Sequence, residues 1–428
     1  MSKPKHLISV FGLVMINVAA LGGIRNWAPI AECGFSSVFL LTFGSLLFLI
    51  PLALISAELA TTWPGDGGVY GWVKKAFGHR MGFLAIWFLW IQNVIWYPTA
   101  LAIIASMVTY VINPALVQNK TFMAILVVSL FWGATFLNLK GIKISTWVST
   151  LGAICGTFIP SVLIIAFGIF WYVQGKPLQI SFTVDSLIPS MTSFGELGLF
   201  AGVIVSLLGM EMSAVHANNV KNPQSNYPKA IFFTTLSVIL FSSLGVLAIA
   251  MVVPQSEISL NAGCLQAFEY FFREYGLQFL MIPCAIIMAI GVLGSMSTWI
   301  MGPCVGLLAA SKPEYVSGFF RKTNEKGVPS NLLIIQAALV SVLSLLFLFM
   351  PTINSAYWIL LVLSTQLYLL MYLLLFTSAI RLRVLFPDVT RPFKVPGGRP
   401  GIWICGLGGV GVSVFALSTG FALPEEIS

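Results

Sequence analysis

Two short segments of the chain combine glycine with a charged residue inside otherwise apolar sequence. The first runs from Asn17 to Arg25 and holds the pair Gly22-Gly23, and the second runs from residue 206 to residue 211 and holds Gly209. Because glycine tolerates non-helical backbone, each segment predicts an interruption in a helix. A broken helix presents free amides, which attract anions, and free carbonyls, which attract cations. Two such breaks facing each other would suit a zwitterion such as a free amino acid.

The residues expected to contact this ligand follow from the two breaks. Amides of the first break would bind the carboxylate: Gly22, Gly23 and Ile24. Carbonyls or a side-chain amide would come from Asn17 and Ala20. Carbonyls of the second break would bind the ammonium: Ser206, Leu207 and Gly209. The alternative is that these glycines only allow helices to pack closely.

Two charged residues next to the predicted breaks have more than one interpretation. Arg25 could bind a substrate carboxylate through two hydrogen bonds, or it could pair with Glu32 or Glu196, or extend to the outer interface. Glu211 is a candidate for coupling transport to protons, because charged residues inside a span are functional by default and desolvation favours the neutral acid. The alternative for Glu211 is a fixed hydrogen-bond acceptor. His216 is the rival proton site, because histidine titrates near neutral pH.

The composition defines the elements that must position these residues. Of 428 residues, 58% are hydrophobic and only 8% are charged, with a mean hydropathy of +0.95. Soluble domains carry about 25% charged residues. A soluble enzyme, a disordered chain and a nucleic-acid binder are therefore excluded, and a transmembrane barrel would give a weaker hydropathy signal. The sequence predicts an all-α polytopic membrane protein.

Apolar runs of about 20 residues or more mark the spans. Eleven are predicted: Leu7–Ala31, Ser36–Thr61, Met81–Ile112, Thr121–Leu139, Ile144–Val173, Gly195–Ala217, Lys229–Val253, Leu277–Ala310, Ser330–Phe349, Thr352–Phe386 and Gly401–Ala422. With the N-terminus inside, 18 of the 22 Lys and Arg fall in inner loops, three fall in outer loops and Arg25 falls within span one. This asymmetry predicts a multi-pass protein with a cytoplasmic N-terminus. The alternative for residues 1–21 is a cleavable signal peptide.

The first ten spans divide into two halves of opposite topology. Spans one to five cover residues 7–173, spans six to ten cover residues 195–386, and span eleven covers residues 401–422. Each half begins with one of the interrupted helices, which is the pattern of an inverted-repeat transporter with its binding site at the repeat interface. We therefore predict a single transport domain over residues 1–428.

Several motifs resemble the amino acid–polyamine–organocation superfamily, and within it the glutamate:GABA antiporter family. They are Ala57–Gly78, Gly209–His216 with Lys221-Asn-Pro and Tyr227-Pro, Trp299–Cys304, Gly327-Val-Pro and Arg391–Gly398. The resemblance covers nearly the whole chain and implies the leucine-transporter fold. It also implies that Trp299 faces the substrate pathway. Ser295 stands where the glutamate:GABA antiporter has an acidic residue, and so it joins the expected substrate-binding residues.

The predicted function is secondary active transport of amino acids. The resemblance implies an antiporter that exchanges amino acids, or an amino acid and its decarboxylated amine, in a bacterial inner membrane. The alternatives are a proton- or sodium-coupled symporter and, in another class, a channel or substrate sensor. A sodium site of Thr150, Ser297 and Thr298 is a further alternative. We expect no enzymatic activity, cofactor or bound metal, because the sequence has no phosphate-binding loop and no metal-ligand spacing. The expected partners are the amino-acid substrate, membrane lipids and possible coupling protons.

Overall fold

The computed structural model describes most of the chain. Its described residues are 8–21, 23–64, 68–113, 116, 118–141, 150–152, 154–189, 194–259, 262–311 and 317–420. Within these ranges, the side chains that lie outside the description are those of residues 19, 20, 25, 110, 111, 194–199, 215–219, 298 and 354.

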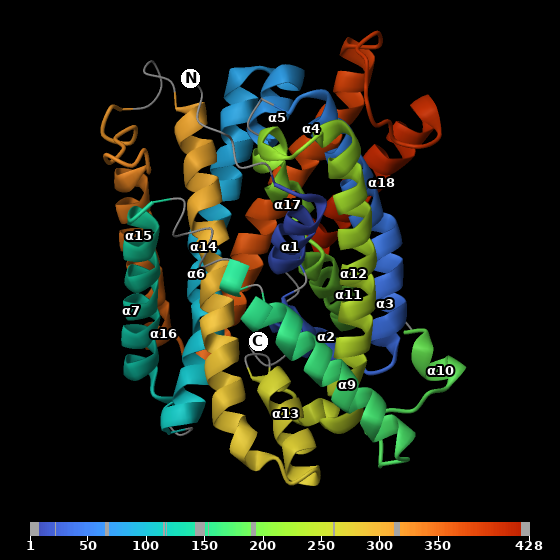
Figure 1. Ribbon diagram of the computed structural model, residues 1–428, viewed down its shortest axis with the longest axis vertical. Helices are drawn as coiled ribbons and strands as arrows, with labels where there is room; N and C mark the ends of the chain where they lie inside the picture. The colour runs from blue at the N-terminus through green and yellow to red at the C-terminus, as the bar shows by residue number, and fades with distance from the viewer. Residues whose placement is uncertain are drawn as a thin grey trace.

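The described part of the chain is helical apart from one isolated bridge between Ile8 and Val220 (Figure 1). The first half holds α1 (Val10–Leu21), η1 (Ile24–Asn26), α2 (Trp27–Ala31), α3 (Ser36–Gly44), the π turn η2 (Ser45–Leu49), α4 (Ile50–Thr62), α5 (Val69–Phe77), α6 (His79–Ile112), α7 (Lys120–Leu139), the π turn η4 (Ile154–Phe158) and α9 (Ile159–Val173). The second half holds α10 (Val184–Leu187), α11 (Phe194–Ser206), η5 (Met210–Asn219), α12 (Pro223–Val252), η6 (Gln255–Glu257), α13 (Gly263–Glu274), η7 (Gln278–Leu280), α14 (Met281–Ala310), α15 (Ser330–Ser344), α16 (Leu346–Phe349), α17 (Ile353–Leu385) and α18 (Gly398–Thr419).

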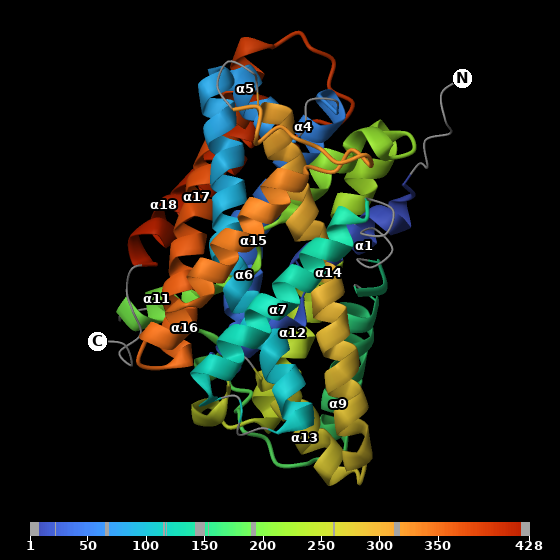
Figure 2. The ribbon, with the colours of Figure 1, turned by 90° about the vertical axis from the view of Figure 1, so that its left-hand side faces the viewer.

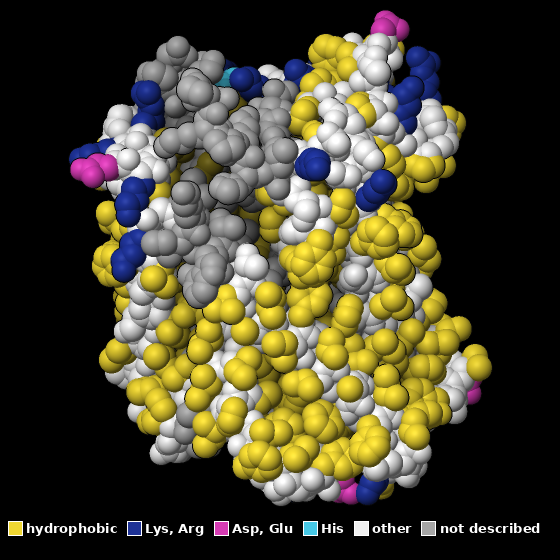
Figure 3. Space-filling model, in the orientation of Figure 1, with side chains coloured by type: hydrophobic (Ala, Val, Ile, Leu, Met, Phe, Trp, Pro, Cys, Tyr) yellow, Lys and Arg dark blue, Asp and Glu magenta, His cyan; other side chains and the backbone are white. Residues whose placement is uncertain are grey.

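Nine helical segments of the described part are long and apolar enough to cross a membrane. They correspond to nine of the eleven predicted spans, and the remaining two spans are the ones predicted to be broken. Large apolar side chains point outward along these helices, among them Phe232, Ile282 and Ile404. Figure 3 shows such side chains covering the middle and lower part of one face, where lipid would solvate them, while most of its Lys and Arg lie toward the upper end. The chain is therefore an all-α polytopic membrane protein.

Both predicted interruptions are confirmed. The first span ends as α1 at Leu21 and resumes as η1 at Ile24, and Gly23 between them has an extended backbone with φ −60° and ψ 128°. The sixth span ends as α11 at Ser206 and resumes after Gly209 as the 3-10 helix η5. Gly209 has φ +120°, and an added Cβ would lie 3.2 Å from the Trp299 ring. Both the conformation and the close approach therefore favour glycine at this position.

The helices pack in two groups around the broken spans. The long helix α6 packs against both α14 and α17, and Figures 1 and 2 show the three running side by side. The helix α12 packs against α1, α4 and α9, and η5 packs against α1 and α4. The two interrupted spans therefore lie between α12 and α4 on one side and α14 on the other.

Candidate functional site

A small cavity lies where the two broken spans meet α6, α14 and α17. Its lining residues are Asn26, Gln92, Asn93, Trp96, Val205, Leu208, Trp299, Leu361, Ser364, Thr365 and Tyr368. Asn26 ends the 3-10 turn that follows the first break, and Leu208 lies within the second. As in small-molecule sites, mostly apolar walls are combined with a few polar groups. The cavity therefore touches both interrupted helices, as the sequence predicted for the binding site.

The first break keeps two of its predicted ligand residues beside the cavity. Gly23 and Ile24 lie three and two residues before Asn26, and the Gly23 carbonyl accepts a hydrogen bond from the Asn26 N–H at 3.0 Å. The Ile24 carbonyl accepts a hydrogen bond from the Cys264 thiol of α13 at 3.1 Å, so Cys264 is a free cysteine that holds the break. Gly22 and the side chains of Ala20 and Arg25 lie outside the described residues.

Asn17 lies one turn before the first break and is fully buried in α1. Neither its Oδ1 nor its Nδ2 has a hydrogen-bond partner in the described part of the structure. Buried amides are normally satisfied, and an unsatisfied one costs about 1–3 kcal/mol. Asn17 therefore has hydrogen-bonding capacity left for a ligand or water.

The second break is held by short-range backbone bonds and by a tyrosine. The Leu207 N–H donates to the Ile204 carbonyl at 3.0 Å, and the Gly209 N–H donates to the Tyr372 hydroxyl at 2.8 Å. Ser206 donates its own hydroxyl to the Val203 carbonyl at 2.6 Å. Leu208 lines the cavity, whereas the predicted ligand residues Ser206, Leu207 and Gly209 are its immediate neighbours in the chain.

Glu211 is buried, and both of its carboxylate oxygens are hydrogen-bonded to α17. Tyr368 donates to Oε1 at 2.6 Å and Tyr372 donates to Oε2 at 2.5 Å. Tyr372 also accepts the Gly209 N–H, so one hydroxyl connects the break to the carboxylate. This geometry supports the interpretation of Glu211 as a fixed acceptor that holds the second break, and its coupling role stays a prediction. The tyrosine pair was not predicted from the sequence, although its spacing of four residues on a predicted helix places both side chains on one face.

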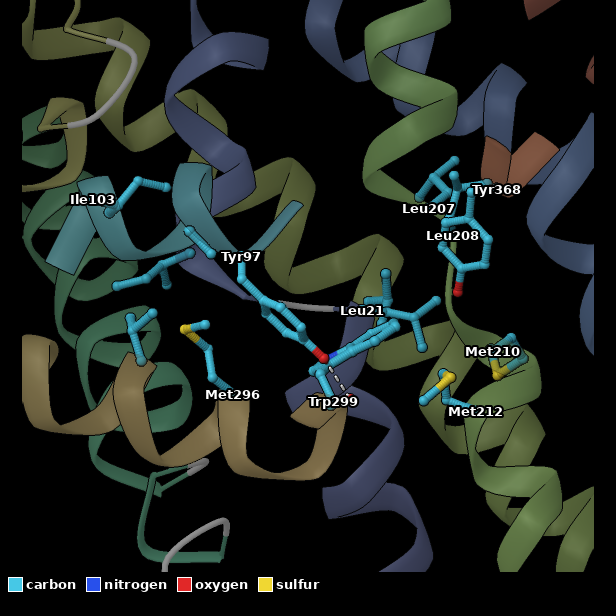
Figure 4. Close-up of a cluster of buried hydrophobic side chains, with 14 of the residues drawn as sticks. Leu21, Tyr97, Ile103, Leu207, Leu208, Met210, Met212, Met296, Trp299 and Tyr368 are labelled. Carbon is cyan, nitrogen blue, oxygen red and sulfur yellow. Dashed lines mark hydrogen bonds between the residues drawn. The ribbon is translucent and has the colours of Figure 1, made fainter. Parts of the chain in front are cut away.

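Trp299 lines the cavity from α14, and a tyrosine fixes the backbone beneath it (Figure 4). The helix contains Pro303, which has no N–H to donate to the carbonyl of residue 299. The Tyr97 hydroxyl of α6 donates to this carbonyl at 2.8 Å instead. Figure 4 shows the Tyr97 ring pointing at Trp299, with Leu21 on the other side of the indole. The Trp299 side chain is therefore held between α6 and the first break.

Two other predicted residues, Ser295 and Ser297, lie away from the cavity lining. Ser295 donates its hydroxyl to the Gly291 carbonyl at 3.1 Å. Its backbone lies so close to Gly152 that a Cβ added to Gly152 would be 2.5 Å from the Ser295 nitrogen. Ser297 donates to the Asn138 side chain at 3.1 Å and so joins α14 to α7. The side chains of Thr298 and His216 lie outside the described residues. In the part that is described, no group of three or more His, Cys, Asp or Glu side chains is placed to bind a metal.

A buried ion cluster lies outside the cavity lining, at the end of α4. Glu58 accepts hydrogen bonds from Arg383 of α17 and from the Val395 N–H, the latter at 2.7 Å. The Arg391 Nε lies 3.2 Å from Glu58 Oε1. These partners belong to the end of α17 and to the loop before α18.

The fold and the cavity together define the class of this protein. An all-helical membrane protein with a cavity between two interrupted helices has the architecture of a secondary transporter. The family described as "Amino acid permease" matches residues 6–428. The chain belongs to this family.

Individual relatives are similar over nearly the whole chain. An uncharacterised transporter of Legionella pneumophila is 42% identical over 429 residues, covering 100% of this chain and 92% of that protein. A glutamate/gamma-aminobutyrate antiporter of Lactococcus lactis is 31% identical over 429 residues, covering 98% of this chain and 85% of that protein. A probable agmatine/putrescine antiporter of the same species is 25% identical over 402 residues, covering 93% of this chain and 84% of that protein.

Proposed function

We propose that this amino-acid transporter is an antiporter, which exchanges amino acids, or an amino acid and its decarboxylated amine, by alternating access. The observation that carries the proposal is the cavity between the two interrupted helices. The similarity to a glutamate/gamma-aminobutyrate antiporter and to a probable agmatine/putrescine antiporter supports exchange over one-way transport. The proposal includes two inverted repeats, residues 7–173 and 195–386, and a cytoplasmic N-terminus in a bacterial inner membrane.

In this proposal the ligand lies with its zwitterionic end between the breaks. Amides near Gly23 and Ile24 bind the carboxylate, and carbonyls near Ser206 and Leu207 bind the ammonium. Trp299 covers the ligand from the α14 side. The Lys and Arg side chains gathered at the upper end in Figure 3 are consistent with that end lying in the cytoplasm.

Exchange is tested in proteoliposomes that contain the purified chain. Vesicles preloaded with an unlabelled amino acid should take up the labelled form several times faster than empty vesicles, because the return step of an antiporter needs a bound substrate. Equal rates in loaded and empty vesicles would refute antiport and leave symport or uniport. A current that does not saturate with substrate would indicate a channel.

The position of the site is tested with Gly23→Val. Gly23 has an ordinary extended backbone that any residue adopts, so we expect the variant to fold. The added side chain would crowd the amides that bind the carboxylate, and exchange should be lost. Normal substrate affinity in a folded Gly23→Val protein would place the carboxylate elsewhere.

A further inference from the structure

The cavity wall formed by α6 presents two neighbouring amide side chains. Gln92, Asn93 and Trp96 all line the cavity, and their spacing on α6 places them on one side of that helix. The cavity lining also includes Val205 and Leu208 at the second break. A ligand whose zwitterionic end lies at the breaks would therefore direct its side chain toward Gln92 and Asn93.

Asn93 has a defined orientation and offers an acceptor. Its Nδ2 donates to the Leu89 carbonyl at 2.7 Å, one helical turn earlier. Reversing the amide would place two oxygens against each other, so the Oδ1 atom must be the one that is free. Asn93 is fully buried, and this oxygen has no partner in the described part of the structure.

Gln92 supplies the complementary donor. The residue is 4% exposed, and its Nε2 has no hydrogen-bond partner among the described residues. The Ser364 hydroxyl on α17 also lines the cavity, but it donates to the Leu361 carbonyl at 2.9 Å. Leaving a buried donor and a buried acceptor unsatisfied would cost about 1–3 kcal/mol each. A ligand that pairs with both would remove this cost.

The chemistry of the pair discriminates between kinds of substrate side chain. A carboxamide has both a donor and an acceptor, whereas a carboxylate only accepts and an ammonium only donates. None of the cavity-lining residues in the described part of the structure is charged. A charged substrate side chain at this wall would be desolvated without an opposite charge among those residues. On the basis of the proposed transport function, we propose that the substrate side chain carries a carboxamide, bound by Gln92 and Asn93.

The first test compares ligands that differ mainly in this group. Glutamine, glutamate and ornithine compete for uptake of labelled glutamine at neutral pH in proteoliposomes with the wild-type chain. Glutamine should compete about tenfold or more better than glutamate and ornithine, because each of the other two loses one hydrogen bond and buries a charge. Glutamate or ornithine competing as well as glutamine would overturn the carboxamide assignment and leave the proposed exchange intact. Failure of every amino acid and amine to exchange would instead refute the proposed function itself, and this inference with it.

A second test assigns the preference to the α6 wall. Asn93→Asp converts the free acceptor into a negative charge, so the preference for glutamine over ornithine should fall about tenfold or reverse. Gln366→Glu is the matched control, because Gln366 is also a buried amide without a partner in the described structure but does not line the cavity. The control should keep the wild-type order of ligands. An unchanged order in a folded Asn93→Asp protein, or the same change in both variants, would refute the role of Asn93.

Discussion

Replacing Glu58 by Gln tests how much the ion cluster at the end of α4 contributes to stability. The wild-type carboxylate receives two hydrogen bonds from Arg383 and one from the Val395 N–H, and it faces Arg391 Nε at 3.2 Å. Glu58 is 3% exposed, and the side chains of Arg383 and Arg391 are 11% and 2% exposed. Glutamine keeps the shape of the side chain but leaves two buried guanidinium groups without their counter-charge.

The expected cost follows from this burial. Removing one partner of a buried ion pair typically costs about 3–5 kcal/mol, because the remaining charge stays desolvated. The shift in melting temperature is this cost divided by the unfolding entropy, which scales with chain length. The melting temperature should therefore fall by about 3–6 °C. Arg391 keeps hydrogen bonds to the carbonyls of Leu382 and Phe386, so the cost should lie toward the lower end of this range.

The assay is thermal unfolding of the purified chain in one detergent, with Glu274→Gln as the control. Glu274 pairs with Lys176, but these side chains are 39% and 34% exposed, and an exposed pair contributes only about 0–1 kcal/mol. The control should therefore lower the melting temperature by about 1 °C or less. If the two variants melt at the same temperature, the cluster does not stabilise this end of the protein. The Glu58→Gln/Arg391→Gln double variant should lose less than the sum of the two single losses.

Three further substitutions test the contacts around the cavity. Gly209→Ala should cost about 1–3 kcal/mol and impair exchange, because φ is +120° and the added Cβ would crowd the Trp299 ring. Tyr97→Phe should cost about 1 kcal/mol and weaken substrate binding, because it removes the donor to the Trp299 carbonyl; adding Pro303→Ala restores an N–H donor and should recover at least half of the loss. Tyr372→Phe should cost about 2–3 kcal/mol, because it leaves both the Gly209 N–H and one Glu211 oxygen without a partner.

The effects of these substitutions are measured by thermal unfolding and by substrate affinity. Each is compared with a control variant or with an outcome that would refute it. Gly411→Ala adds a Cβ where nothing lies within 4 Å, and it should leave stability within about 0.5 kcal/mol. Equal losses in Gly209→Ala and Gly411→Ala would refute the packing argument. If the Tyr97→Phe/Pro303→Ala protein is less stable and binds substrate more weakly than Tyr97→Phe alone, the restored N–H does not replace the lost hydrogen bond. Tyr368→Phe removes one bond to Glu211 and should cost less than Tyr372→Phe.

The spans and their interruptions could be predicted from sequence because their causes are local. Lipid excludes unsatisfied backbone, so each apolar run of sufficient length must be a helix. A glycine such as Gly209 next to a charge marks where that helix stops. The 3-10 geometry of η5 could not be predicted, because it depends on the contacts that Tyr368 and Tyr372 make with Glu211 from a helix more than 150 residues later.

The contacts of the site were harder to predict because they join distant segments. Glu58 illustrates the difficulty, because its bonds go to Arg383 and Arg391, more than 300 residues later in the chain. Trp299 was found only through the family resemblance. Asn93 was not predicted as a site residue, because only the fold shows that it lines the cavity beside Gln92. The inverted repeats stay a prediction.

The contacts of α17 restrict which movements could open the cavity. Tyr372 and Arg383 lie eleven residues apart on one helix, about 16 Å along its axis. Tyr372 packs against Phe48 of η2 with ring centroids 5.3 Å apart, and Arg383 pairs with Glu58 of α4, so α17 is attached to span two at two levels. Separating α17 from span two would break the buried ion cluster, at about 3–5 kcal/mol. Moving α14 past the second break loses mainly van der Waals contacts of Trp299, so that boundary offers the less costly movement.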